Sequence, residues 1–151
     1  MVSREPTSAT GIRVRGCAQA HTHQHITAAP ALSELGAEIA VAKAKNAAGL
    51  SIADVRYAAV YDSFTITLAM LLEDLGLAGR GEAAVRVRAG HFGRDGAMPL
   101  NTHGGLLSYG HCGVGGAMAH LVETHLQMTE RAGARQVRDA SIALLHGDGG
   151  V

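Results

Sequence analysis

The sequence of residues 101–116 is Asn-Thr-His-Gly-Gly-Leu-Leu-Ser-Tyr-Gly-His-Cys-Gly-Val-Gly-Gly. Apolar residues at helical spacing follow it, so we expect a glycine-rich loop that leads into a helix over 114–131. Glycine lets backbone N–H groups approach a ligand closely, and a helix N-terminus favours a negative charge nearby. His111 in this loop could therefore stabilise an oxyanion or relay a proton.

Strand and helix patterns alternate before this loop. Ile12, Val14 and Gly16 alternate with arginines, which predicts a half-buried strand. The spacing of apolar residues predicts a helix over 32–48, with Ser33 as a candidate N-cap and Gly49 as the C-terminal stop.

A second strand and helix are expected next. The short apolar run 55–60 predicts a buried strand, and residues 64–75 a helix that starts directly after it. Residues 82–88 fit either a short helix or a strand.

The last third of the chain repeats the alternation. The predicted helix over 114–131 carries Met118, Leu121, Val122, His125 and Met128 at helical spacing, and the apolar run 140–145 has the length of a strand. This order predicts an α/β domain with a largely parallel, layered sheet, helices on both faces and functional sites at the strand ends.

Three segments at the C-terminal ends of strands could carry chemistry. They are the glycine-rich loop with His111, the segment Tyr61-Asp-Ser-Phe64, and the segment that begins with His146. In the loop, Asn101, Gly110 and Gly113 are the candidate substrate contacts.

Several short motifs together resemble the C-terminal half of the thiolase superfamily, most closely its sterol-carrier and lipid-transfer branch. The motifs are Gly16-Cys-Ala-Gln-Ala20, Tyr61-Asp-Ser-Phe64, Leu72-Glu-Asp-Leu-Gly76, Pro99-Leu-Asn-Thr-His-Gly-Gly-Leu-Leu-Ser108 and Gly110-His-Cys112. The last of these stands where that family has a Gly-His-Pro box. The resemblance covers residues 11–151, after a polar lead-in over 1–10 that we expect to be flexible.

The resemblance implies one half of a two-domain, dimeric acyl-CoA acyltransferase of lipid metabolism, with coenzyme A thioesters as substrates and no further cofactor. The family's nucleophilic cysteine belongs to an N-terminal half, which this chain would need as a partner. By position His111 inherits the role of activating that cysteine and of contributing to an oxyanion hole. We also expect the domain to lack its last strand, and the isolated chain to have no thiolase activity.

Two departures from the family pattern affect the chemistry. The lipid-transfer branch usually shows His-Asp-Cys-Phe where this chain has Tyr61-Asp-Ser-Phe64, so Tyr61 and Ser63 replace its oxyanion and acid/base groups. A serine holds its proton far more tightly than a thiol with a pKa of about 8.5, so Ser63 cannot do the work of that cysteine. His146 begins the segment that matches the family's Cys-x-Gly motif and could relay protons instead.

Two other hypotheses remain open. Tyr61 and Tyr109 resemble the paired tyrosines of thiolase-like aldolases, which cleave a β-hydroxy acyl-CoA without a nucleophilic cysteine and work with a small partner containing zinc-ribbon and OB-fold parts. In that case the two phenols would transfer protons. The third hypothesis is a non-catalytic module that binds acyl-CoA or lipid.

Composition excludes other classes of function. The 151 residues include 13 Lys+Arg and 13 Asp+Glu, which gives no electrostatic footprint for nucleic acid, and no apolar run could span a membrane. Two cysteines are too few for a disulfide framework, so a cytoplasmic location is expected. His21, His23 and His25 alternate but lack a closed ligand set, so no metal site is predicted.

Overall fold

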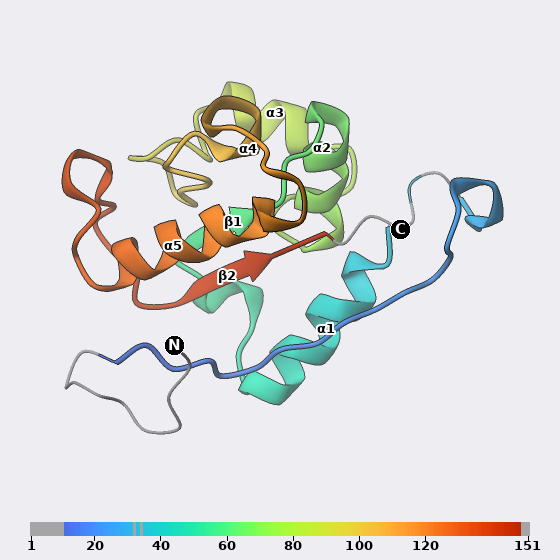
Figure 1. Cartoon of the computed structure of the whole chain (residues 1–151), viewed down its shortest axis with the longest axis horizontal. Coiled ribbons are helices and arrows are strands. Elements are labelled where there is room, and N and C mark those ends of the chain that lie inside the picture. The colour runs from blue at the N-terminus through green and yellow to red at the C-terminus, as the bar shows by residue number, and fades with distance from the viewer. Residues whose placement is uncertain (1–10, 32, 34, 149–151) are drawn as a thin grey trace.

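A computed structural model describes residues 11–148, apart from residues 32 and 34 (Figure 1). The predicted lead-in over 1–10 lies outside the described residues. The elements follow in the order η1 (Ile26–Ala28), α1 (Ala37–Ala48), η2 (Ile52–Asp54), β1 (Tyr57–Val60), α2 (Thr65–Asp74), α3 (Ala83–Arg88), α4 (Gly105–Tyr109), η3 (Gly113–Gly115), α5 (Gly116–Met128), η4 (Gly133–Arg135) and β2 (Ala143–His146).

The sheet confirms the predicted parallel arrangement. Strand β1 pairs in parallel with β2, with Tyr57 opposite Ala143 and Val60 opposite His146. On the other side of β1, Ala58 forms an isolated parallel bridge with Leu100. The segments that follow these three stretches therefore leave the sheet at the same edge.

Helices cover both faces of β1, as predicted. All four β1 residues are fully buried, and their side chains alternate between two clusters. Ala58 and Val60 pack with residues of α1, α2 and α3, whereas Tyr57 and Ala59 pack against Val137, Ala140 and Met128 of α5. Figure 1 shows α5 crossing one side of the strand pair.

The predicted strand at residues 12–16 is wrong. Residues 11–20 have no regular secondary structure, and the Val14 side chain is 79% exposed. The segment instead runs alongside α1 (Figure 1), where Arg15 donates a hydrogen bond to the Ala48 carbonyl. Gly16 lies so close to the Ala44 carbonyl that a Cβ would not fit, so the segment packs on a helix instead of pairing with a strand.

The first predicted helix starts later than expected. Helix α1 begins after Gly36, which has a φ of 75°, so Ser33 is not its N-cap. The predicted stop at Gly49 is confirmed, because Gly49 takes the left-handed conformation with φ of 65° and its N–H bonds to carbonyls of the last turn.

The remaining elements agree with their predictions to within a few residues. The predicted strands at 55–60 and 140–145 correspond to β1 and β2, and the predicted helices at 64–75 and 114–131 to α2 and α5. Residues 82–88, for which the sequence allowed either a short helix or a strand, contain the helix α3.

Helix α5 buries a polar face and exposes an apolar one, the reverse of what its apolar spacing suggests. Its buried residues are Gly116, His120, Glu123, Thr124 and Gln127. Met118, Leu121 and Val122 are 56%, 46% and 54% exposed. The polar face meets other polar groups in the interior, so hydrogen bonds and an ion pair join apolar packing on this side of the domain.

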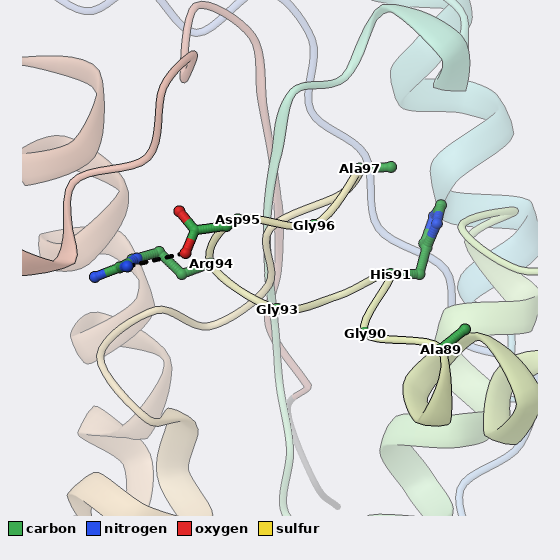
Figure 2. A pocket seen from close by; sticks show the side chains of 8 residues that line it. All are labelled: Ala89, Gly90, His91, Gly93, Arg94, Asp95, Gly96 and Ala97. Atoms are coloured by element: carbon green, nitrogen blue, oxygen red, sulfur yellow. Dashed lines mark hydrogen bonds and ion pairs between the residues drawn. The ribbon is translucent and has the colours of Figure 1, made fainter.

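At least two hollows open on the surface of the described residues. One, of about 600 Å³, lies in the loop 89–97, where Arg94 and Asp95 form an ion pair of 2.9 Å and His91 points the other way (Figure 2). Another, of about 830 Å³, lies between residues 12–24, α1 and β2. Within the part of the chain that the structure describes, no helix combines the length and apolar character needed to cross a bilayer.

Candidate active site

The candidate site lies at the edge where the parallel strands end. Tyr61 directly follows β1, and Asn101 follows the bridge residue Leu100. Because β2 ends at His146, opposite Val60, the fold brings all three predicted segments to the carboxyl ends of adjacent strands, where ligands usually bind in α/β sheets.

Tyr61 and His111 are hydrogen-bonded to each other. The Tyr61 hydroxyl oxygen lies 2.5 Å from His111 Nε2, and the two rings meet edge to face with centroids 5.7 Å apart. His111 lies against the first turn of α5, because a Cβ on Gly116 would be 3.3 Å from its Nε2. Residues 50 positions apart in the sequence therefore form one phenol–imidazole pair.

The second nitrogen of His111 fixes the direction of this hydrogen bond. The Gly113 N–H donates to His111 Nδ1 at 3.1 Å, so Nδ1 acts as an acceptor. A neutral imidazole carries its one proton on the other nitrogen, so Nε2–H donates to the Tyr61 oxygen. The Tyr61 hydroxyl proton is then free to point toward a ligand.

Tyr61 is protonated at neutral pH. Burial raises the pKa of Tyr61 above its ordinary value of 10, and the carboxylates of Asp148 and Asp62 act in the same direction. The group is therefore suited to donate a hydrogen bond or a proton to a negatively charged oxygen.

Asp62 anchors the loop beneath this pair. Its side chain is almost fully buried and accepts N–H hydrogen bonds from Leu106 at 2.8 Å and Leu107 at 3.4 Å. These N–H groups belong to the first turn of α4, where backbone donors have no partner inside the helix. The carboxylate thus ties the end of β1 to α4.

Asn101 performs a similar function at the start of the loop. Its side-chain oxygen accepts the Val60 N–H and its amide donates to the Val60 carbonyl, both at 2.8 Å. It holds a φ of 46°, unusual for a residue other than glycine. The structure therefore uses the amide of this predicted substrate contact to hold the loop against β1.

Tyr109 joins the site through two histidines, the partly buried His103 and the fully buried His120. The Tyr109 ring is 5.6 Å from the His103 ring, which is 5.1 Å from the His120 ring, and the latter is 6.4 Å from the Tyr61 ring. Tyr109 ends α4 and is 69% exposed. The two predicted tyrosines lie at opposite ends of this row of rings.

A buried carboxylate on α5, Glu123, supports the same loop and pairs with a partly exposed arginine. Glu123 accepts hydrogen bonds from Thr102 at 2.7 Å and from Arg135 at 2.9 Å. Gln127, one turn further along α5, donates to Thr102 at 2.9 Å. Burial acts to raise the pKa of Glu123, but these hydrogen bonds outweigh it and lower the pKa, so Glu123 is ionised.

The remaining predicted site residues are His146, Gly110 and Gly113. His146 is paired with Val60 across the sheet and shares its face, the face covered by α1 and α2. Burial lowers the pKa of His146, and its buried Nδ1 has no hydrogen-bond partner. Gly110 and Gly113 use their N–H groups within the loop, toward Leu106 and His111.

The cysteines and the N-terminal histidines do not form a site in the described structure. Cys17 and Cys112 are exposed free thiols. Among the residues that the structure describes, no three histidine, cysteine or acidic side chains are grouped so as to hold a metal ion.

Sequence reasoning gave no role to Asp62, His103, His120 and Glu123. One signal was present: His120, Glu123, Thr124 and Gln127 follow each other at the spacing of one helix face. A polar stripe at this spacing is normally solvated, so only the position of α5 against the strand ends shows that it is buried.

Comparison with known proteins shows which family and which proteins this chain resembles. Residues 18–151 match the family described as Thiolase C-terminal domain-like. The chain is 36% identical over 110 residues to the acetyl-CoA acetyltransferase of Methanothermobacter thermautotrophicus, covering 71% of this chain and 29% of that protein. It is 33% identical over 107 residues to human sterol carrier protein 2, covering 71% and 20%.

Two comparisons point to lyases. The chain is 46% identical over 59 residues to the 17-hydroxy-3-oxo-4-pregnene-20-carboxyl-CoA lyase of Mycobacterium tuberculosis, which is 39% of this chain and 15% of that protein. The solved Ltp2-ChsH2(DUF35) aldolase superposes with a TM-score of 0.67 and 27% identity, over 80% of this chain and 33% of that one. The chain thus spans less than a third of each of these three curated relatives.

Proposed function

The chain belongs to the Thiolase C-terminal domain-like family, and on this premise we propose that it is the C-terminal half of an enzyme that cleaves or forms a carbon–carbon bond in an acyl-CoA thioester. The predicted resemblance and the α/β fold class are confirmed by the family match and by the solved aldolase. Between the two enzymatic hypotheses, we propose the retro-aldol cleavage of a β-hydroxy acyl-CoA.

The observation that carries this proposal is the hydrogen bond between Tyr61 and His111. His111 Nε2–H donates to the phenol oxygen, which makes the Tyr61 hydroxyl a stronger proton donor. A protonated phenol backed by an imidazole N–H is suited to a substrate oxygen on which negative charge develops. No cysteine is needed for this step.

The proposed reaction is balanced without an oxidant or reductant. A base takes the proton of the β-hydroxyl group, the bond between the α and β carbons breaks, and the β carbon becomes a carbonyl. The electron pair moves into the thioester, whose enolate oxygen is stabilised by Tyr61 and His111. Protonation of the α carbon then releases a shortened acyl-CoA.

We assign the proton transfers to the two tyrosines. Tyr61 is the donor, because its raised pKa keeps the phenol protonated at neutral pH and its proton is free to point toward the substrate. Tyr109 is the candidate relay for the substrate hydroxyl proton: it would take that proton as it passes its own to the partly buried imidazole of His103, which stands beside it and whose nitrogens have no partner. General acid–base groups of this kind contribute about 10²- to 10⁴-fold.

An acyltransferase remains the second candidate. The 36% identity to an acetyl-CoA acetyltransferase and the position of His111 in the Gly-His box favour it. This reaction requires a nucleophilic cysteine from the N-terminal half, which His111 would activate. His111 is hydrogen-bonded to Tyr61 in the present structure, which favours the aldolase.

We propose that an N-terminal thiolase half completes the site, and call the two together the complete enzyme. The Tyr61–His111 pair, with His111 exposed beside the start of α5, would face this partner at the edge of the sheet. The exposed apolar residues Met118 and Val122 of α5 offer a surface for such a partner. A homodimer, a small partner with zinc-ribbon and OB-fold parts and a cytoplasmic location belong to the same proposal.

The test is the product formed by the complete enzyme. It should convert a β-hydroxy acyl-CoA to a ketone or aldehyde and a shortened acyl-CoA, both measured by mass spectrometry, and should not cleave acetoacetyl-CoA in the presence of coenzyme A. Cleavage of acetoacetyl-CoA alone would establish the acyltransferase. Tight binding of acyl-CoA without turnover of either substrate would establish a binding module.

A further inference from the structure

His120 is a buried histidine for which the proposed reaction gives no role. Its side chain is 0% exposed, on the polar buried face of α5. Neither ring nitrogen has a hydrogen-bond partner, and the nearest acceptor is Asp62, whose Oδ1 lies 3.4 Å from Nε2. A buried polar group without partners destabilises the fold by roughly 1–3 kcal/mol, so its presence calls for a function.

His120 lies in the middle of the polar groups that form the site. Its ring centroid is 6.4 Å from that of Tyr61 and 5.1 Å from that of His103, which in turn faces Tyr109. The two imidazoles thus form a row of ring contacts between the two tyrosines. A substitution at His120 can therefore alter the positions of both phenols.

His120 is neutral at neutral pH. Burial lowers its pKa to about 4, and the nearby imidazoles of His103 and His146 act in the same direction, against the opposing effect of the Asp62 carboxylate. A neutral imidazole has one N–H, which can be directed toward Asp62 while the other nitrogen stays an acceptor. The ring then adds no positive charge behind Tyr61.

We propose that His120 is a positioning residue of the site, which holds the Asp62 carboxylate from α5 and thereby fixes Tyr61 against His111. This inference rests on the proposed function, because it concerns the phenol that the retro-aldol reaction uses. His120 does not touch the substrate; it acts through its neighbours.

The connection from His120 to Tyr61 has two parts. Asp62 follows Tyr61 directly in the chain, and its carboxylate already accepts the N–H groups of Leu106 and Leu107. His120 Nε2 lies 3.4 Å from the same oxygen that Leu106 binds, a contact that falls short of a hydrogen bond, so the carboxylate meets α4 and α5 at once. Without His120, Asp62 can turn about its side-chain bond, and the backbone of Tyr61 loses one of its fixed points.

The kinetic test compares three variants of the complete enzyme. In His120→Leu the retro-aldol kcat should fall by about 10²-fold with KM almost unchanged, because a displacement of about 1 Å at the reacting groups has this effect. His120→Gln, whose amide N–H can reach the position of Nε2, should recover most of the loss. Thr124→Val is the control, since Thr124 lies one turn along the same buried face and its hydroxyl also has no partner.

The thermal stability of the variants distinguishes a positioning role of His120 from a merely structural one. Replacing an unpartnered buried polar group by an apolar one of similar size is close to neutral or stabilising, so His120→Leu should melt at or above the temperature of the wild type while losing kcat. A variant that loses stability and activity together, with no recovery in His120→Gln, would overturn the proposal. So would a wild-type kcat in His120→Leu.

A crystal structure of the complete enzyme with His120→Leu distinguishes this inference from the proposed function. The oxygen of Tyr61 should move beyond hydrogen-bond distance of His111 Nε2, whatever reaction the enzyme catalyses. If the wild type has no retro-aldol activity, the proposed function fails, and this distance alone decides the inference. An unchanged hydrogen bond between Tyr61 and His111 in the variant would overturn it.

Discussion

The carboxylate of Asp62 occupies the space in which a side chain at Gly105 would have to lie. A Cβ on Gly105 would overlap Asp62 Oδ2, and Gly105 itself has a φ of 68°. Glycine at this position therefore lets the buried carboxylate reach the N–H groups at the start of α4. The connection between the end of β1 and α4 depends on these two residues together.

Gly105→Ala should consequently lower the stability of the domain and remove activity. The substitution combines the strain of a positive φ, about 1 kcal/mol or more, with displacement of Asp62 from its hydrogen bonds. Gly81→Ala is the matched control, because Gly81 has a φ of 76° and open space around its Cβ position. Thermal melts of both variants check this; equal losses would show that the overlap with Asp62 is unimportant.

Stability should rise with pH across the range in which His120 titrates in the unfolded chain. The pKa of His120 is about 4 in the folded protein against the usual 6.5, so between these values the unfolded chain binds more protons and acid favours unfolding. The difference corresponds to at most roughly 3 kcal/mol.

Chemical denaturation at pH 5 and pH 7 measures this effect. The free energy of unfolding should increase from pH 5 to pH 7 in the wild type, and the increase should be smaller in His120→Leu. The partly buried His103 and His146 also have lowered pKa values, so the free energy of unfolding of the variant should still rise somewhat with pH. The same slope in the variant and the wild type would show that His120 is not buried in its neutral form.

The buried Glu123 should contribute more to stability than an exposed glutamate with a similar ion pair. Glu123→Gln weakens charged hydrogen bonds to Arg135 and Thr102 and should cost roughly 1.5–3 kcal/mol. Glu82→Gln breaks an exposed ion pair between Glu82 and Arg86 at i,i+4 spacing. This change should lower the free energy of unfolding by less than about 0.5 kcal/mol. Denaturation of the two variants gives both values, and similar losses would contradict the assigned role of Glu123.

The sequence predicted those parts of the fold that depend on local pattern. The apolar run ending at Val60, the helix α2 and the glycine stop at Gly49 follow from hydrophobic spacing and backbone preference. The segment 12–16 has an equally clear strand pattern, but a strand also needs a neighbour to pair with, and here the segment packs on α1. Pairing is a property of the tertiary structure that the pattern cannot reveal.

The same division applies to the candidate site. Tyr61 and His111 were predicted separately, each from its motif at the end of a strand, whereas their hydrogen bond spans 50 residues and required the fold. His120 was overlooked because a polar residue on a helix normally faces water. Its burial follows from the position of α5 against β1 and β2.

The pairing of Tyr61 with His111 is the central claim, and one substitution tests it most directly. Tyr61→Phe removes only the hydroxyl group that His111 binds, and Tyr57→Phe removes a buried phenol hydroxyl outside the pair. With a β-hydroxy acyl-CoA substrate, the kcat of the complete enzyme should fall by about 10²-fold or more in Tyr61→Phe and remain near the wild-type value in Tyr57→Phe. A wild-type rate of cleavage in Tyr61→Phe would contradict the account.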